Sequence, residues 1–206
     1  MEFHPIFPTI IGCAEIPEHE LIRKKYAPRI IDQFKTCPNE QAPWANQCNT
    51  WQVKADDQVN ELFTKYFEKH IHEWFEEFRF PRVKYSVFMW VNVHTWYMYQ
   101  DTHCHQGDHS ILCGNYNLQL NPGDRPLQFT RTPEYRNLLD QETIEAHHLS
   151  LSNKSSEFIN IKEGDLILFS PTQKHFVPCA TEKHDGYRIT LSFNVEHTSV
   201  HPSGDA

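Results

Sequence analysis

The chain has 206 residues, a formal net charge of −8 and a sequence pI near 5.9. This length suits one domain with a single core, and the acidic balance argues against a protein that binds nucleic-acid backbones or anionic membranes by charge. No apolar run approaches the roughly 18 residues of a membrane helix, and the N-terminal residues lack the pattern of a signal peptide, so we expect a cytoplasmic protein that binds no membrane.

The six cysteines are scattered along the chain without a CxxC pair. In a chain of this size that shows no secretion signal, such cysteines are more typical of free thiols than of a disulfide framework.

Residues 1–82 are expected to be mainly helical. Residues 3–16 combine β-forming residues with two prolines, which indicates an edge strand or an extended lead-in. Residues 17–35 have a helical pattern, but Pro28 predicts two short helices or one kinked helix. Residues 36–52 are polar and rich in proline, and we interpret them as a long connector.

Residues 56–78 form the strongest predicted helix. Asp56 or Asp57 is placed to cap its first turn, and Pro81 ends the pattern. Charged side chains fall between apolar ones that recur at helical spacing. The apolar positions are Val59, Leu62, Phe63, Tyr66, Phe67, Ile71, Trp74, Phe75 and Phe78.

From residue 83 the pattern changes to the period of two that is typical of a β-strand. Residues 83–94 carry bulky side chains on both faces, which predicts a strand covered by the long helix on one side and lining a barrel on the other. The turn sequence Asn121-Pro122-Gly123-Asp124 follows the next strand. Further strands are predicted at residues 111–120, 161–169 and 186–195, and residues 126–160 are interpreted as a loop.

Helices followed by a run of strands indicate an α+β protein with a barrel or jelly roll as its core. We therefore expect one domain over residues 1–206, with the jelly-roll core at 83–196 and a flexible tail at 197–206.

A histidine pair separates two of these β-segments. His103 and His105 are two residues apart, so on an extended backbone their side chains point the same way and could reach one metal ion. Asp108 and His109 follow directly and offer further ligands. A two-histidine, one-carboxylate iron site would need such a set, with open positions for substrate and oxygen.

Two residues further along the chain complete the candidate site. His175 lies in a turn bounded by prolines after a short apolar strand, where it is placed to be a third ligand. Arg188 shares one face of the last strand with Thr190, Ser192 and Asn194. A buried arginine on that face could bind a carboxylate through two hydrogen bonds, and the alternative is an ordinary salt bridge on a polar outer face.

Seven short segments occur in a fixed order over nearly the whole chain. They are IFPTIIG at 6–12, WVNV at 90–93, HCH at 103–105, CGNYNL at 113–118, EGDLILFSP at 163–171, His175, and RITLSFN at 188–194. This ordered set resembles a family of 2-oxoglutarate/iron(II) oxygenases of bacteria and of phages that infect marine bacteria, and it is much more specific than any one of the segments.

The resemblance implies a double-stranded β-helix, the jelly-roll relative of the cupins, with the N-terminal helices packed on one sheet. It also implies Fe(II) as cofactor and 2-oxoglutarate as cosubstrate, with O2 as the oxidant. It suggests His103 or His105, or both, as the first metal ligands, His175 as the distal ligand, and Arg188 with Thr190 as the groups that hold the far carboxylate of 2-oxoglutarate.

One position departs from the wider superfamily, because His105 stands where an aspartate or glutamate is usual. Three ligand sets therefore remain open: three histidines, histidines with Asp108, or only two protein ligands.

Three functions follow from these observations. The first is an Fe(II)- and 2-oxoglutarate-dependent dioxygenase that hydroxylates a substrate the sequence does not reveal and releases succinate and CO2. The second is a three-histidine, cupin-type dioxygenase that does not use 2-oxoglutarate, and the third is a jelly-roll binding module without enzymatic activity. In the first case Tyr99, Tyr116 and Phe129 are expected to line the pocket.

Overall fold

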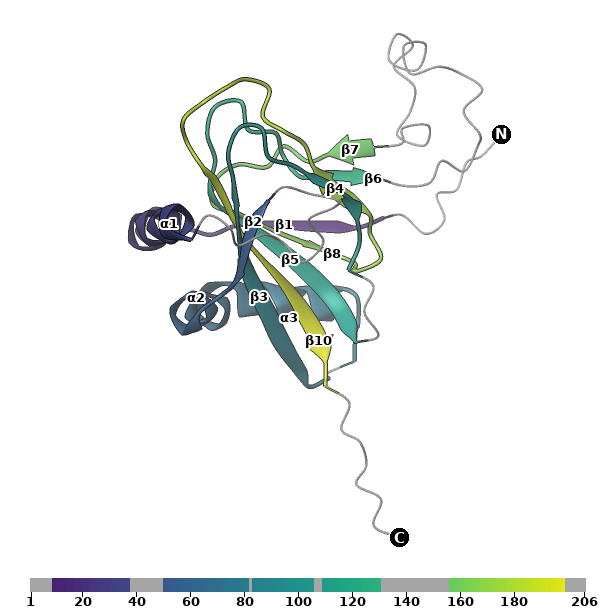
Figure 1. Cartoon of the computed structure of the whole chain (residues 1–206). Coiled ribbons are helices and arrows are strands. Elements are labelled where there is room, and N and C mark those ends of the chain that lie inside the picture. The colour runs from purple at the N-terminus through teal and green to yellow at the C-terminus, as the bar shows by residue number, and fades with distance from the viewer. Residues whose placement is uncertain (1–8, 38–49, 82, 106–108, 131–155, 199–206) are drawn as a thin grey trace, which may run out of the picture.

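The computed structural model describes residues 9–37, 50–81, 83–105, 109–130 and 156–198 (Figure 1). Their strands form two antiparallel sheets of six and four strands. The helices cover one face of the larger sheet, and the smaller sheet covers part of the other face. This is the double-stranded β-helix, or jelly roll, that the sequence led us to expect.

The larger sheet has the strand order β1-β8-β5-β10-β3-β2. Its strands are β1 (Ile11–Glu15), β8 (Asp165–Phe169), β5 (Ser110–Gln119), β10 (Arg188–His197), β3 (Tyr85–His94) and β2 (Trp51–Lys54). The central strand β10 pairs with β3 along its whole length and with β5 along most of it. The last segment of the chain is therefore locked between two earlier ones.

The smaller sheet has the strand order β4-β9-β6-β7. Its strands are β4 (Gln100–His103), β9 (His175–Val177), β6 (Gln128–Thr130) and β7 (Ser156–Phe158). Apolar residues of this sheet, including Phe129 and Val177, pack against Ile167 and Phe169 of the larger sheet. The two sheets therefore face each other across a small second core.

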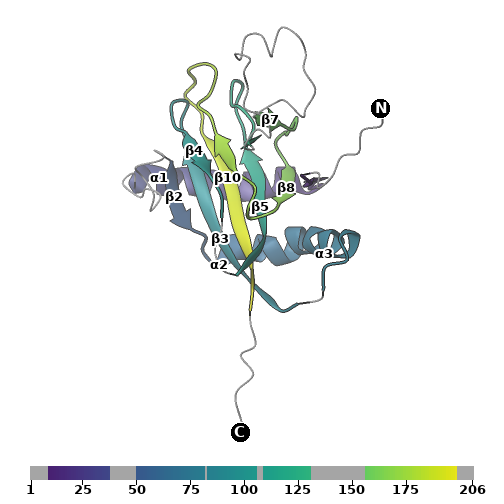
Figure 2. The same cartoon turned by 90° about the vertical axis from the view of Figure 1, so that its right-hand side faces the viewer.

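The helices lie behind the larger sheet (Figure 2). α1 (His19–Thr36) is separate in the chain from α2 (Asp57–Leu62), which continues through the π-helical turn η2 (Phe63–Phe67) into α3 (Glu68–Glu77). Asp56 caps α2, as predicted, because its side chain accepts a hydrogen bond of 3.0 Å from the backbone nitrogen of Val59. The strongest predicted helix is thus confirmed, with a π turn inside it.

Alternation along the strands separates an apolar face from a polar one. On β10, Leu191 and Phe193 belong to the core beneath the helices, whereas Thr190 and Ser192 point toward the smaller sheet. Residues paired across β3, β10 and β5 share these faces. The helix side is consequently a conventional hydrophobic core, and the space between the sheets has a polar wall.

Pro28 lies inside α1, which is a single helix, so of the two predicted alternatives the division into two short helices is excluded. Two other expectations from the sequence need correction. The predicted connector at 36–52 ends in Trp51, which begins strand β2, and residues 38–49 lie outside the described part of the chain. The predicted loop at 126–160 contains β6 and β7, two strands of three residues each, which are too short to give a period.

Three further expectations concern a turn, the cysteines and the C-terminal tail. The predicted turn at 121–124 is confirmed by a hydrogen bond of 3.0 Å from the Asp124 nitrogen to the Asn121 carbonyl and by a φ of 88° at Gly123. Cys13, Cys37, Cys104, Cys113 and Cys179 are free thiols, as expected. Most of the predicted tail, residues 199–206, is outside the described residues.

Within the described ranges, no helix has the length and apolar character needed to cross a membrane.

Gly114 gives the core beneath the helices a testable feature. The ring of Phe193, the partner of Gly114 across β5 and β10, lies where a side chain at residue 114 would be, and it packs 5.2 Å from Phe63 and 6.0 Å from Phe67 between ring centroids. A Cβ at this position would overlap the Phe193 ring, which is fully buried.

We predict that Gly114→Ala lowers the free energy of unfolding by about 1–3 kcal/mol, the usual cost of overpacking a core. Gly12→Ala is the matched control, since its added Cβ would meet the Trp74 ring at 3.1 Å and require only a small shift. Urea unfolding of both variants measures the difference. Equal stability of Gly114→Ala and the unaltered protein would contradict this packing.

Candidate metal centre

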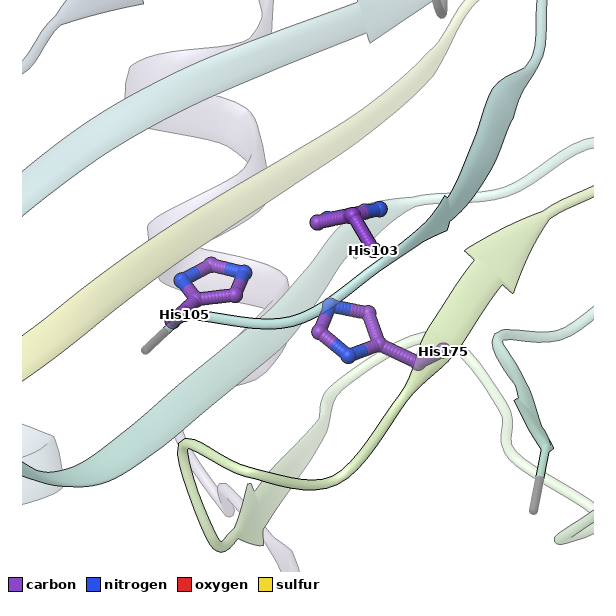
Figure 3. A group of neighbouring side chains, drawn as sticks. All are labelled: His103, His105 and His175. Carbon is purple, nitrogen blue, oxygen red and sulfur yellow. The ribbon is translucent and has the colours of Figure 1, made fainter. Parts of the chain in front are cut away.

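Three histidine side chains meet between the two sheets (Figure 3). His103, His105 and His175 each offer one ring nitrogen, and these atoms lie within 4.8 Å of one another. The ring centroids are 4.3 Å apart for His103 and His175, 5.0 Å for His105 and His175, and 5.3 Å for His103 and His105. Nitrogens gathered in this way around one point could bind a single metal ion.

The smaller sheet brings the histidines together. His103 is the last residue of β4 and His175 the first of β9, and the two are direct partners in the antiparallel pairing. The chain then leaves β4 and is held by a hydrogen bond of 2.9 Å from the backbone nitrogen of His105 to the carbonyl of Pro171. Strand pairing therefore places two of the rings, and a single backbone hydrogen bond places the third.

Each of the three rings has its Nδ1 hydrogen-bonded to an oxygen that accepts. The acceptors are the Asp101 carbonyl at 2.7 Å for His103, the Asn194 Oδ1 at 2.8 Å for His105 and the Gln173 carbonyl at 2.9 Å for His175. Since a carbonyl oxygen can only accept, Nδ1 carries the proton in each ring, and Nε2 keeps the lone pair that a metal requires.

Burial also keeps the three rings in their metal-binding protonation state. Desolvation lowers the pKa of His103 and lowers the pKa of His105 to about 4 and that of His175 to about 3. Neutral imidazole is the form that binds metal ions, so at neutral pH all three side chains are ready to act as ligands.

Aromatic rings surround the histidines. Trp90 stacks on His105 with a centroid distance of 5.5 Å and an interplanar angle of 23°, while Phe169 lies 4.7 Å from the His175 ring. Phe129 approaches His175 from β6 at 6.5 Å. These rings limit the access of water and strengthen electrostatic interactions at the site.

A buried cation lies on the same side of the larger sheet. Arg188, the first residue of β10, is 2% exposed, and its Nη1 donates a hydrogen bond of 2.7 Å to the Arg125 carbonyl. Burial lowers the pKa of Arg188 to about 10, which leaves it charged at neutral pH. In the described part of the chain, its Nε has no hydrogen-bond partner and no carboxylate lies within the 4.0 Å of an ion pair.

This environment favours an anionic ligand at Arg188, because a buried charge without a counter-charge is costly. Asp124 acts on Arg188 only at longer range, and its own oxygens are engaged by the backbone of Asn121 at 2.7 Å and by His184 at 3.1 Å.

Buried amides and hydroxyls occupy the sheet surface between Arg188 and the histidines. Ser192 Oγ accepts hydrogen bonds from the side-chain amides of Asn92 at 3.0 Å and Asn115 at 2.9 Å, and Thr190 Oγ1 accepts one from Asn92 at 3.3 Å. The hydroxyl protons of Thr190 and Ser192 can therefore be donated to a ligand.

A second group of possible metal ligands lies outside this space, at His19, Glu20 and Glu163. His19 is hydrogen-bonded to the Tyr116 hydroxyl at 2.7 Å, and Glu163 accepts a hydrogen bond of 2.6 Å from the Leu120 nitrogen. The guanidinium of Arg23 lies 3.4 Å from Glu163 and already supplies positive charge. We therefore interpret this group as a structural contact between α1 and the larger sheet.

Several sequence-based expectations about the site can now be assessed. His175 is not in a turn but begins β9 and is only 4% exposed. His109 is exposed and is not part of the histidine group, and Asp108 lies outside the described residues.

The predictions for the three aromatic residues that were expected to line the pocket have different outcomes. Phe129 does approach His175. Tyr116 was predicted wrongly, because it faces the helices and packs against Phe67 with a centroid distance of 4.9 Å. Tyr99 is 37% exposed, and its lining role stays a prediction.

Sequence reasoning missed the roles of Asn194 and Trp90. Alternation placed Asn194 on the same face as Arg188, which was the available signal, but its partner His105 is 89 residues away in the chain. Trp90 lay within a recognised β-segment, yet nothing local indicated that its ring stacks on His105.

The sequence matches a protein family described as "Putative 2OG-Fe(II) oxygenase" over residues 88–194, just over half of the chain. The matched segment contains His103, His105, His175 and Arg188. No curated protein sequence matches the chain.

Solved structures with the same fold share little sequence with the chain. A prolyl-4-hydroxylase from Pseudomonas putida has a TM-score of 0.64 at 9% identity, covering 93% of this chain and 94% of its own. A viral collagen prolyl hydroxylase from Paramecium bursaria Chlorella virus-1, solved as a 2-oxoglutarate complex, has a TM-score of 0.57 at 12% identity, with 91% and 96% covered. HygX from Streptomyces hygroscopicus, solved with nickel, 2-oxoglutarate and hygromycin B, also has a TM-score of 0.57 at 12% identity, with 92% and 84% covered.

The structural likeness establishes the fold, and the family match extends over the core strands and all four candidate site residues. The chain therefore belongs to the 2-oxoglutarate/Fe(II) oxygenase family and is an oxidoreductase that uses Fe(II), 2-oxoglutarate and O2.

Proposed function

We propose that His103, His105 and His175 hold Fe(II) through their Nε2 atoms and that Arg188, with Thr190, binds the distal carboxylate of 2-oxoglutarate. The site would support hydroxylation of a C–H bond in a substrate, with release of succinate and CO2. The observation that carries this proposal is the convergence of the three histidines: one ring nitrogen of each lies within 4.8 Å of the others, and the Nδ1 of each ring is hydrogen-bonded to a protein oxygen.

The donor set suits the metal that the family uses. Imidazole is a good ligand for iron, and three protein ligands leave positions for the cosubstrate and for oxygen. We propose a three-histidine centre because a ring nitrogen of each of His103, His105 and His175 lies within 4.8 Å of the other two. Asp108, the acid considered from the sequence, lies outside those residues, and its role as a ligand remains a prediction.

Arg188 and Thr190 have the properties expected of a carboxylate anchor. Arg188 is a buried cation without a described counter-ion, and Thr190, two residues along the same face of β10, has a hydroxyl proton to donate. Both are 2% exposed, which strengthens their interaction with an anion that reaches them.

The chain's own residues bind the metal, orient the cosubstrate and exclude water. Iron with its two cosubstrates supplies the oxidising chemistry. The histidines fix the metal, Arg188 and Thr190 orient the oxo acid, and Trp90 and Phe169 shield the centre from water.

We also propose that residues 1–206 act as one oxygenase domain in the cytoplasm. The N-terminal part contributes β1 and β2 to the larger sheet, so it is not separable from the core strands. The free thiols of the five described cysteines suit a reducing compartment.

Replacement of Arg188 tests the cosubstrate assignment. We predict that Arg188→Met raises the 2-oxoglutarate concentration for half-maximal succinate formation about 10- to 150-fold, which corresponds to the loss of a charged hydrogen bond. Iron binding should be retained, because Arg188 is not a ligand. The assay is succinate release with Fe(II) and O2 in the absence of a prime substrate.

The matched control is Arg29→Met, which removes an exposed arginine paired with Asp56 on the helical side. It should leave the 2-oxoglutarate requirement unchanged. An Arg188→Met protein that needs no more 2-oxoglutarate than the control would argue against this anchor, and iron binding without any succinate release would favour a three-histidine dioxygenase of another kind.

Asn194 provides a second test, directed at the metal. We predict that Asn194→Ala weakens Fe(II) binding about 10- to 100-fold, since groups that orient a ligating histidine typically contribute this much. Asn194→Asp keeps an acceptor for His105 Nδ1 and should bind Fe(II) nearly as tightly as the unaltered protein. Competition with a metallochromic chelator under anaerobic conditions measures both, and unchanged affinity in the alanine variant would refute the orienting role.

A further inference from the structure

His94 at the end of β3 lies in a row with Arg188, the first residue of β10, and with Thr50, which directly precedes β2. Arg188 is the register partner of His94 between β10 and β3, and the pairing of Trp51 with Val93 places Thr50 beside His94. Residues paired in this way direct their side chains to the same face of a sheet. None of the three is more than 2% exposed.

Hydrogen bonds at Thr50 determine which nitrogen of His94 carries the proton. The Thr50 hydroxyl donates its only proton to the Tyr99 carbonyl at 3.1 Å, and its oxygen lies 2.8 Å from His94 Nε2. Both hydrogen bonds form together only if Thr50 accepts from His94, which places the proton of the neutral ring on Nε2. In neutral His94, Nδ1 is then an acceptor.

Two buried atoms in this row have complementary and unused hydrogen-bonding capacity. Among the described residues, neither His94 Nδ1 nor Arg188 Nε has a hydrogen-bond partner. The first can only accept and the second can only donate. An unpaired buried polar atom costs roughly 1–3 kcal/mol, and His94 and Arg188 are direct register partners on β3 and β10. A side-chain adjustment that joins the two atoms in a hydrogen bond is therefore favourable when a ligand binds.

The surroundings keep His94 in the form that this hydrogen bond requires. Burial, and then the charge of Arg188, lower the pKa of His94 well below its ordinary value. A charged imidazolium next to the guanidinium would be repelled, whereas a neutral ring presents a lone pair to it.

We propose that His94 is a positioning residue for Arg188: when the cosubstrate binds, His94 Nδ1 accepts a hydrogen bond from Arg188 Nε and fixes the plane of the guanidinium. The Arg125 carbonyl restrains Nη1 from another direction. The remaining N–H groups then face the distal carboxylate of 2-oxoglutarate with little freedom to rotate. This inference rests on the proposed role of Arg188, and it adds a specificity determinant for oxo acids that end in a carboxylate.

A pair of oxo acids isolates this effect. 2-Oxoglutarate has a distal carboxylate, and 2-oxopentanoate has the same chain length with a methyl group in its place, so only the first depends on Arg188. Anaerobic calorimetric titration of the Fe(II)-loaded protein with each acid gives the ratio of the two affinities. A variant that is less stable or that loses iron would bind both acids more weakly, and the ratio of the two affinities would stay nearly unchanged.

We expect His94→Leu to lower the affinity for 2-oxoglutarate about tenfold or more, with little change for 2-oxopentanoate. His94→Asn places an amide oxygen near the position of Nδ1 and should recover much of the ratio. Thr50→Val, which removes the acceptor of Nε2–H, should lower the ratio in the same direction. His72→Leu makes the same chemical change on exposed α3 and should keep the original ratio.

The same titrations distinguish the proposed role of Arg188 from the proposed role of His94. An unaltered protein that prefers neither acid would overturn the role of Arg188 and this inference with it. A preference for 2-oxoglutarate that is as large in His94→Leu as in the unaltered protein would overturn the inference alone.

Discussion

The short pairing of β4 with β9 is the constraint on which the candidate site depends. It places His103 directly opposite His175, although the two residues are far apart in the chain. His105 joins them because its backbone is tied to Pro171, on the segment that leads into β9. Few interactions hold these strands, yet they decide whether three imidazoles meet or remain scattered along the chain.

The larger sheet supports this arrangement by having two chemically different faces. Its outer face carries the apolar residues that pack beneath the helices, and this core stabilises the strands. Its inner face carries amides, hydroxyls and Arg188, which would be costly to bury unless they were hydrogen-bonded to one another or to a ligand. The interior is thus polar where a dicarboxylate is expected and aromatic around the histidines.

Much of this was predictable from alternation and spacing. Helical periodicity identified residues 56–78, and the period of two identified β3 and β10, because each of these segments is long enough to repeat its pattern. β5 and β8 were also predicted as strands, the latter from its short apolar run. The HxH spacing and the placement of Arg188 on a polar strand face indicated the main candidate residues. The family resemblance then connected them to iron and 2-oxoglutarate, and the family match agrees.

The remaining features were hidden because they depend on contacts between distant segments. β2, β6 and β9 are only three or four residues long and show no period of their own. His175 looked like a turn residue because its burial comes from the opposite sheet. Tyr116 illustrates the reverse error: an aromatic residue near a site motif faces the helices, since its neighbours on β5 alternate between the two sides.

Substrate choice is not determined by this framework. The solved structures of the same fold include prolyl hydroxylases and a protein crystallised with hygromycin B, all at 12% identity or less.

The most direct test of the central claim is an anaerobic titration of the protein with Fe(II), followed by 2-oxoglutarate, monitored by visible absorption. If the three histidines and Arg188 form one site, the weak metal-to-ligand charge-transfer band of a chelated 2-oxo acid should appear at one equivalent of iron and should be lost in His175→Ala. A protein that binds iron without developing this band, or whose band survives the loss of His175, would contradict the account.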